Sequence, residues 1–202
     1  MNRHAADLQG VTIRCKKVGM PEIETARTHL RMFTPDDLDD LAQIVADPAV
    51  MKYMGLNGQP MSRDETEIAL DSIINHWRRH SIGRWAVVHK AERRLIGYGG
   101  LRWFEGVGQQ AGMPELVYLI DSAYWGRGLA TEIARASLKF GFEERKFEQV
   151  VAMTRPGNAV SRHILEKKLG MRFSGQQTAF GIEVVRYLIT RVQYESDGAS
   201  SF

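Results

Sequence analysis

The chain contains very little cysteine: Cys15 is the only one among its 202 residues. A single cysteine cannot form an internal disulfide, so a disulfide-stapled fold is excluded and a reducing, cytoplasmic location is expected. The sequence also lacks any apolar run approaching the ~20 residues that cross a bilayer, so we expect no membrane partner.

A large excess of charge of one sign is missing too. The 27 Lys and Arg residues nearly balance the 24 Asp and Glu residues, which gives a formal net charge of +3. The cations are spread along the chain, whereas nucleic-acid binding proteins usually concentrate them in a stripe. An anionic small ligand fits this balance at least as well as nucleic acid, and we do not expect a nucleic-acid partner. An RNA-associated basic module is favoured only by the mildly basic composition.

Motifs for metal or covalent chemistry are also absent. His76 and His80 are four residues apart, but two arginines stand between them and the Glu of a zinc-protease motif is missing, so we expect no metal site. The sequence has no P-loop Gly-Lys-Ser/Thr and no Gly-x-Ser-x-Gly nucleophile motif. A covalent intermediate on the enzyme is therefore not expected.

The length suits one domain with a substantial core. We expect this domain to span residues 21–195, with residues 1–20 a disordered leader and residues 196–202 a flexible tail. A regular apolar pattern begins only after Met20, which is a candidate for the native start.

The apolar pattern predicts a mixed order of helices and strands. Thr34 precedes a first helix that ends at Asp47, and Ser62 precedes a second, with Glu65 at the capping-box spacing. A third helix follows residue 128 and a fourth spans 159–169. Extended runs are expected at 28–33, 84–89, 94–103, 115–120, 149–154, 171–178 and 184–192. Because hairpins join most of these strands, we expect an α/β (α+β) fold with a mixed, mostly antiparallel sheet of about seven strands and about four helices.

The most informative segment is Ala123–Glu132, which joins an apolar run to the start of a helix through small residues. A helix that begins near Gly128 leaves its first amide groups without partners at the positive end of its dipole. Gly126 and Gly128 lack Cβ atoms, so a phosphate can approach the backbone closely. The segment predicts a cradle for a diphosphate, although an ordinary strand-to-helix turn also uses such glycines.

This segment resembles the acyl-CoA signature of the GNAT N-acetyltransferase superfamily, Gln/Arg-x-x-Gly-x-Gly/Ala. Gly128 and Ala130 fill its small positions, and Trp125 replaces its first polar residue. The form Tyr-Trp-Gly-x-Gly-x-Ala-Thr-Glu is typical of the branch that acetylates the N-terminal alanine or serine of ribosomal proteins. Three further segments resemble that branch in the same order: Glu24–Arg31, Leu95–Leu101 and Asn158–Met171. The resemblance implies the GNAT acyl-CoA N-acyltransferase fold from about Glu22 to Val192.

The resemblance implies acetyl-CoA as the cosubstrate and assigns its contacts. Backbone groups of Tyr118, Leu119 and Ile120 would lie along the pantetheine arm, with an oxyanion-stabilising N–H from the same strand. Asn158 would contact the pantetheine region, and the pyrophosphate would be held by backbone amides of Gly126, Arg127, Gly128, Leu129, Ala130 and Thr131. Each position also has a structural interpretation: a core strand for 118–120 and a helix N-cap for Asn158.

The catalytic candidates are Glu115 and Ser161. Glu115 begins a strand next to the expected acyl group, where a partly desolvated carboxylate could accept a proton; the alternative is an acid at the end of a surface strand. Many relatives carry a catalytic Tyr on the last helix, but this chain has Leu165 there, and the helix is one residue longer than the common pattern. Ser161 remains as the acid or as a contact to the thiol sulfur, unless it is simply a surface serine. A thiolate whose pKa is about 8.5 needs little help to leave.

The sequence therefore predicts an acetyl-CoA-dependent N-acetyltransferase. The acetyl group would move directly from the thioester to a primary amine of a protein N-terminus or a small molecule. The loop 50–61, Trp103, Phe104 and the closing strands are candidates for the acceptor's walls, and a closing strand could pair in a homodimer. The alternative is a catalytically weak acyl-CoA-binding or sensor protein of the same fold.

Overall fold

The computed structural model describes residues 11–15, 21–104, 112–179 and 181–198, and their strands form one sheet. The spatial order is β1-β2-β3-β4-β5-β6-β7-β9-β8, and all neighbours are antiparallel except β6 and β7. The strands are β1 (Thr12–Cys15), β2 (Pro21–Glu24), β3 (Thr28–Arg31), β4 (Arg84–His89), β5 (Arg94–Trp103), β6 (Pro114–Ile120), β7 (Gln149–Thr154), β8 (Arg172–Ala179) and β9 (Ile182–Thr190). The prediction of a mixed, mostly antiparallel sheet is confirmed.

The described strands number nine rather than about seven, because a hairpin precedes the first expected strand. Thr12–Cys15, inside the segment expected to be a disordered leader, pair with β2, and Ile13 faces Ile23. Ile23 is fully buried. The β-branched residues Thr12 and Ile13 therefore pair in a sheet. The other leader residues, 1–10 and 16–20, lie outside the described part of the chain.

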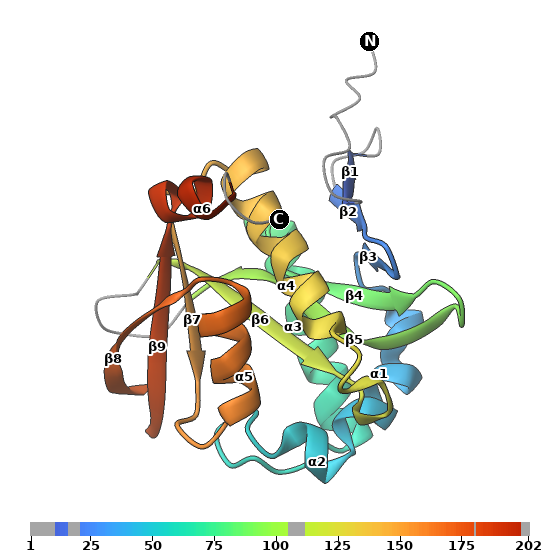
Figure 1. The fold of residues 1–202 in the computed structure, drawn as a ribbon. Helices are drawn as coiled ribbons and strands as arrows, with labels where there is room; N and C mark the ends of the chain where they lie inside the picture. The colour runs from blue at the N-terminus through green and yellow to red at the C-terminus, as the bar shows by residue number, and fades with distance from the viewer. Residues whose placement is uncertain (1–10, 16–20, 105–111, 180, 199–202) are drawn as a thin grey trace.

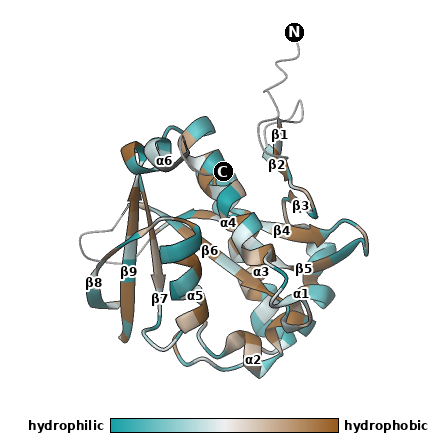
Figure 2. Cartoon of the chain, viewed as in Figure 1, coloured by the Kyte–Doolittle hydropathy of each residue, from teal (hydrophilic) through white to brown (hydrophobic). Residues whose placement is uncertain are grey.

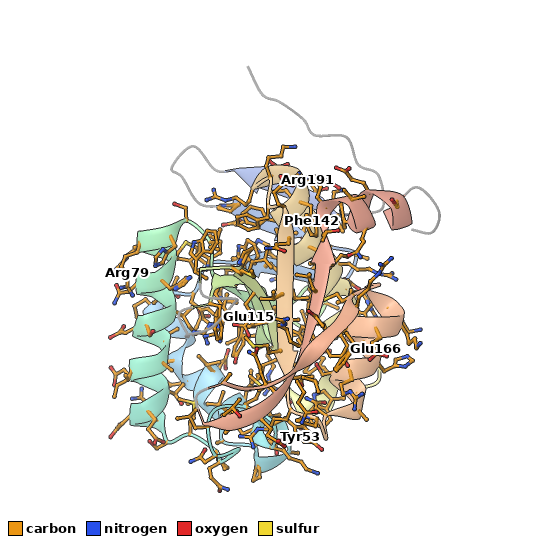
Figure 3. The ribbon with its side chains drawn as sticks, turned by 90° about the vertical axis from the view of Figure 1, so that its left-hand side faces the viewer. Tyr53, Arg79, Glu115, Phe142, Glu166 and Arg191 are labelled. Atoms are coloured by element: carbon orange, nitrogen blue, oxygen red, sulfur yellow. The ribbon has the colours of Figure 1, made fainter. Side chains whose placement is uncertain are left out.

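Helices cover both faces of the sheet. They are α1 (Leu38–Val45), α2 (Pro48–Met51), α3 (Arg63–His80), α4 (Leu129–Lys139), α5 (Ala159–His163) and α6 (Arg191–Gly198). In Figures 1 and 3, α4 and α5 lie on one face of the sheet and α3 lies on the other. None of the helices in the described ranges is long and apolar enough to span a membrane.

Two helices end differently from a regular α-helix. α4 continues into a π-helical turn at Phe140–Glu144, and α5 continues into another at Ile164–Lys168. A π-helical turn holds one residue more than an α-helical turn, which accommodates the extra residue noted between Asn158 and Gly170.

The last strand and the residues that follow it differ from the prediction. The strand expected to reach Val192 ends at Thr190, and residues 196–198 of the expected flexible tail belong to α6. Thr190 and Gln193 exchange hydrogen bonds between side chain and backbone, at 2.9 and 3.3 Å. This reciprocal pair, at the spacing of a capping box, begins α6 and stops the strand.

The core is centred on the long strands. Figure 2 shows hydrophobic residues along the central strands, and hydrophilic residues on much of α5. Trp77 of α3 and Trp85 of β4 are fully buried, with ring centroids 5.0 Å apart, and each indole N–H donates to a backbone carbonyl. Buried indoles with satisfied donors fix α3 against the sheet without an unpaired polar group.

A partly buried ion pair joins β3 to the residue that precedes α1. Arg31 reaches both carboxylate oxygens of Asp37, at 2.6 and 2.8 Å, and Thr34 N–H donates to the same carboxylate. Burial acts to raise the pKa of Asp37, but the hydrogen bonds from Arg31 and Thr34 outweigh it and lower that pKa below its usual value.

Replacing Asp37 with asparagine is expected to lower the free energy of unfolding by about 2 kcal/mol at neutral pH. Because the folded pKa is depressed, this stabilisation is present above the unfolded pKa of about 3.9 and is lost as the pH falls through the folded value. Urea unfolding at pH 7 and in acid measures the difference. The matched control is Asp39→Asn, whose carboxylate pairs with Arg63 but is 76% exposed. Equal losses in both variants would contradict a specific role for Asp37.

Candidate active site

The parallel strands β6 and β7 meet only near their N-terminal ends. One backbone pair joins these two fully described strands, Glu115 with Val151, whereas β6 stays paired with β5 as far as Ile120. Figure 1 shows the two strands diverging toward their C-terminal ends. The β6 edge at Tyr118, Leu119 and Ile120 is therefore not paired with β7. This is the edge on which the resemblance places the pantetheine arm.

The turn that follows β6 has the shape expected of an anion cradle. Gly126 and Gly128 have positive φ angles of +73° and +75°, and α4 begins directly after Gly128. The amide of Glu132 donates to Gly128 O, so the three preceding amides, of Leu129, Ala130 and Thr131, have no acceptor within the helix. Residues 125–128 are exposed, and a Cβ placed on Gly126 would meet no atom within 4 Å.

A carboxylate ties the N-terminal strands to this cradle. Glu132 accepts hydrogen bonds from Thr25 Oγ1 at 2.6 Å and from Arg27 Nε at 2.7 Å, and Arg27 Nη1 donates to Arg127 O at 2.6 Å. Burial acts to raise the pKa of Glu132, but the hydrogen bonds from Thr25 and Arg27 lower it overall, so the carboxylate stays ionised. This contact could not be predicted from the sequence, because no local signal links residues more than 100 positions apart.

Two side chains shape the outer surface of the cradle. The Arg127 guanidinium lies 5.0 Å from the Tyr124 ring centroid and donates to Ala123 O. Trp125 is half exposed, and its indole N–H donates to Ile120 O at 2.8 Å. The Ile120 carbonyl at the end of the β6 edge is therefore already paired with the residue that replaces the usual polar position of the signature.

The start of α5 lies against β6. Asn158 Oδ1 accepts the Ser161 amide at 3.1 Å and so caps the helix, which is the structural role considered for this residue. The hydroxyls of Tyr118 and Ser161 are 2.9 Å apart. Burial raises the pKa of Tyr118 to about 12, although the hydrogen bond with Ser161 opposes the shift, so the phenol is protonated at neutral pH. The sequence analysis assigned Tyr118 only a backbone role and did not predict this hydroxyl pair.

Glu115 lies on the other face of β6. Successive side chains of a strand point to opposite faces, so residues 115 and 118, which are three positions apart, lie on opposite faces of β6. Tyr118 is on the face that α4 covers, because its Cβ and the side chain of Ile133 in α4 both lie next to Gly99. Figure 3 shows Glu115 in the centre, between α3 and the closing strands. The structure therefore does not bring Glu115 and Ser161 into contact; it places them on opposite faces of one strand.

Glu115 is buried and ion-paired. Arg102 Nε and Nη2 both approach Glu115 Oε2, at 2.8 Å, which leaves Oε1 outside this pair. Desolvation dominates and raises the pKa of Glu115, while the charges of Arg102 and Arg84 act to lower it. Neither arginine was a sequence candidate, because their contact depends on the register that places Arg102 opposite Glu115.

The candidate acceptor walls differ in their packing. Phe104 is buried, and Trp103 contacts the Phe147 ring, at 5.4 Å between centroids. The loop 50–61 packs on the segment between β7 and α5: Arg155 Nη2 donates to Gly55 O and Leu56 O. Within the described ranges, no three His, Cys, Asp or Glu side chains form a group that could hold a metal ion.

Comparison with known proteins decides the family. The model of the acetyltransferase (GNAT) domain matches residues 27–172 of this chain. The chain belongs to the GNAT acetyltransferase family. Its activity is thus acetyl-CoA-dependent N-acetylation, as the family resemblance implied. The uncharacterized N-acetyltransferase p20 of Bacillus licheniformis is 27% identical over 149 residues, which cover 72% of this chain and 80% of that protein.

Two solved structures share this GNAT fold. A GNAT-family acetyltransferase from Bacillus anthracis superposes with a TM-score of 0.71 at 23% identity, covering 85% of this chain and 99% of its own. A ribosomal-protein-S5-alanine acetyltransferase from Vibrio fischeri has a TM-score of 0.69 at 14% identity, covering 86% and 98%. At these identities, the likeness shows the fold.

The residues of this GNAT chain fit acetyl-CoA. The open turn at Gly126 and Gly128 offers amides at a helix N-terminus, and the diverging edge of β6 leads away from it. A diphosphate needs the first feature, and an extended amide-bearing arm needs the second.

Replacing Gly128 with alanine is expected to weaken acetyl-CoA binding about tenfold, because a Cβ would stand where a phosphate approaches the backbone. The positive φ should also cost about 1 kcal/mol of stability. Isothermal titration and urea unfolding measure the two effects. The matched control is Gly181→Ala, where φ is +78° and a Cβ meets nothing within 4 Å. It should show the stability cost alone, and equal affinities in the two variants would refute the assignment of the cradle.

Proposed function

We propose that the protein moves the acetyl group of acetyl-CoA directly to a primary amine of a protein N-terminus or a small molecule. The observation that carries the proposal is the part of β6 that separates from β7 and leads to the cradle. Polar side chains lie on both faces of this strand. Glu115 and Arg102 lie on its α3 face, and Tyr118 and Ser161 lie on its α5 face. An acceptor can thus approach from one face while the thiol leaves on the other.

The proposed binding roles are those that the family resemblance implies, and most of them use backbone groups. When bound, acetyl-CoA supplies an activated thioester. The amides of residues 126–131 would hold its pyrophosphate, and the edge at Tyr118, Leu119 and Ile120, which β7 does not pair, would hold its amide-bearing arm. Asn158, the N-cap of α5, would contact the same arm. An N–H of this edge is the candidate donor to the oxyanion.

Glu115 is the proposed general base. Its Oε1 is outside the ion pair with Arg102, and desolvation raises its pKa toward the range in which a carboxylate accepts a proton usefully. The ion pair orients the carboxylate, so that the remaining oxygen can receive the amine proton directly or through water.

Ser161 is the proposed proton donor or sulfur contact on the opposite face. Its hydroxyl is held by the Tyr118 phenol at 2.9 Å, and the phenol is protonated at neutral pH. The Ser161 hydroxyl can donate a hydrogen bond to a departing thiolate without a tyrosine on the helix itself, and a thiolate whose pKa is about 8.5 can then take its proton from water.

A binding assay followed by a turnover assay tests the proposal. Acetyl-CoA at a hundred times its dissociation constant should add about 2.7 kcal/mol of apparent stability in a thermal shift experiment. Thiol release with a panel of amines and N-terminal peptides should then identify acceptors. Absence of a shift would overturn the proposal entirely.

Within this family, a catalytically weak member that serves mainly as an acyl-CoA-binding or sensor protein is the second candidate. It is favoured by the buried Leu165 where relatives carry a tyrosine, and by the pairing of Glu115 with Arg102. A thermal shift with acetyl-CoA, without thiol release for any amine, would support this function instead.

A further inference from the structure

We propose that the acceptor amine carries a carboxylate, which Arg84 binds beside Glu115, so that the acceptors are free amino acids rather than polyamines. This inference rests on the proposed function and names its substrate class. Charged side chains of β4, β5 and β6 lie together on the α3 face of the sheet.

Arg84, Arg102 and Glu115 share this face. Tyr98 and Arg102 have the same parity along β5, and Arg102 is directly opposite Glu115 on β6. The Arg84 guanidinium lies 5.4 Å from the Tyr98 ring centroid, which places it on the same face. The Arg84 charge acts to lower the pKa of Glu115. The Arg102 charge acts to lower the pKa of Arg84.

The cluster has more positive than negative charge. The charge of Glu115 is balanced by Arg102, whose Nε and Nη2 both contact Oε2. Across the described ranges of the chain, no carboxylate lies within ion-pair distance of Arg84; its neighbour is the Tyr98 side chain, whose ring centroid is 5.4 Å away and which also hydrogen-bonds to it. A guanidinium remains charged in a protein, so a partly buried arginine without a paired carboxylate has a desolvation cost that a tyrosine compensates only in part. Burial accordingly lowers the pKa of Arg84.

An acceptor carboxylate would remove this imbalance. A guanidinium binds a carboxylate through two parallel hydrogen bonds, and Arg84 would hold one close to the base. The same two cations disfavour an ammonium group nearby, which helps the acceptor amine to reach its neutral, nucleophilic form. A polyamine would instead bring further positive charge to a site that already has an excess.

The experiment compares matched acceptors on the full-length protein saturated with acetyl-CoA. Thiol release is measured for several amino acids, for their primary amides and for a polyamine. We expect kcat/KM to be about 10- to 100-fold higher for each amino acid than for its amide, as for loss of a charge-assisted hydrogen bond. Amides or polyamines that react as fast as the amino acids would overturn the inference but leave the acetyltransferase activity standing.

Variants then assign the preference to one side chain. Arg84→Gln should reduce the ratio between amino acid and amide to near one, and Arg84→Lys should retain part of it. The control is Arg79→Gln, which removes a cation from the outer side of α3, away from Glu115 (Figure 3). A ratio that stays high in Arg84→Gln, or that falls equally in Arg79→Gln, would overturn the assignment.

A binding measurement separates this inference from the proposed function. The wild-type protein loaded with CoA is titrated calorimetrically with an N-acetyl amino acid and with its amide, which needs no turnover and no variant. Tighter binding of the carboxylate by the same factor supports the inference even if no amine is acetylated. Equal binding of the two compounds would refute it.

Discussion

Glu115→Gln is expected to lower kcat/KM by about 10²- to 10⁴-fold, the range typical of a lost general base. The amide has the shape of the carboxylate but cannot accept the amine proton. Acetyl-CoA binding should be retained because its proposed contacts lie elsewhere, at backbone groups of residues 118–120 and 126–131 and at Asn158. Steady-state kinetics and calorimetry measure the two effects.

The pH profile gives this prediction a second test. Burial raises the pKa of Glu115, and a base works only when deprotonated. The wild-type kcat/KM should therefore rise with pH through a value above the ordinary ~4.3 of a glutamate, and this acid limb should disappear in the variant.

Glu148→Gln is the matched control. Glu148 also pairs with an arginine, Arg191, at 3.1 Å, but its side chain is 83% exposed and it lies just before β7, at the end of that strand where β6 and β7 are still paired. Its turnover should equal that of the wild type. Unchanged turnover of Glu115→Gln between pH 6 and 9 would show that another group, or water, takes the proton.

The largest loss of stability is expected from Gly97→Ala, at least about 4 kcal/mol, which is exceptional for one methyl group. Gly97 has a φ angle of +141°, and a Cβ there would lie 2.0 Å from Leu119 O. Relief of this clash requires β5 and β6 to separate at Ile120, the partner of Gly97, next to the cradle. Urea unfolding should show the loss.

Gly175→Ala separates strain from collision. Gly175 is also in a strand, with a φ angle of +123°, but a Cβ there meets nothing within 4 Å. This variant should lose only the about 1–2 kcal/mol of an unfavourable backbone conformation. Similar losses in both variants would mean that the contact with Leu119 contributes little.

Features that neighbouring residues determine could be predicted from the sequence. The capping box of Ser62 and Glu65 is present, and the strands 84–89, 94–103 and 149–154 have the expected bounds. Turn residues at their ends and apolar runs within them are local signals. α6 was missed because the apolar run before Val192 outweighed the capping signal at Thr190.

Only the backbone part of the candidate site could be predicted from the sequence. The segments 118–120 and 126–131 are contiguous in the chain, and their glycines and apolar run show in the sequence. The contacts of Glu115 with Arg102 and of Tyr118 with Ser161 join separate elements, and they depend on strand register and on how α5 lies against β6. No spacing rule reports such contacts.

The carboxylate of Glu132 has one further consequence for the nucleotide end of the site. An acid in the first turn of α4 would by itself repel a diphosphate, but Thr25 and Arg27 occupy both of its oxygens. The turn between β2 and β3 therefore supplies the counterion of Glu132. An incoming diphosphate meets the positive end of a helix whose own acid is already neutralised.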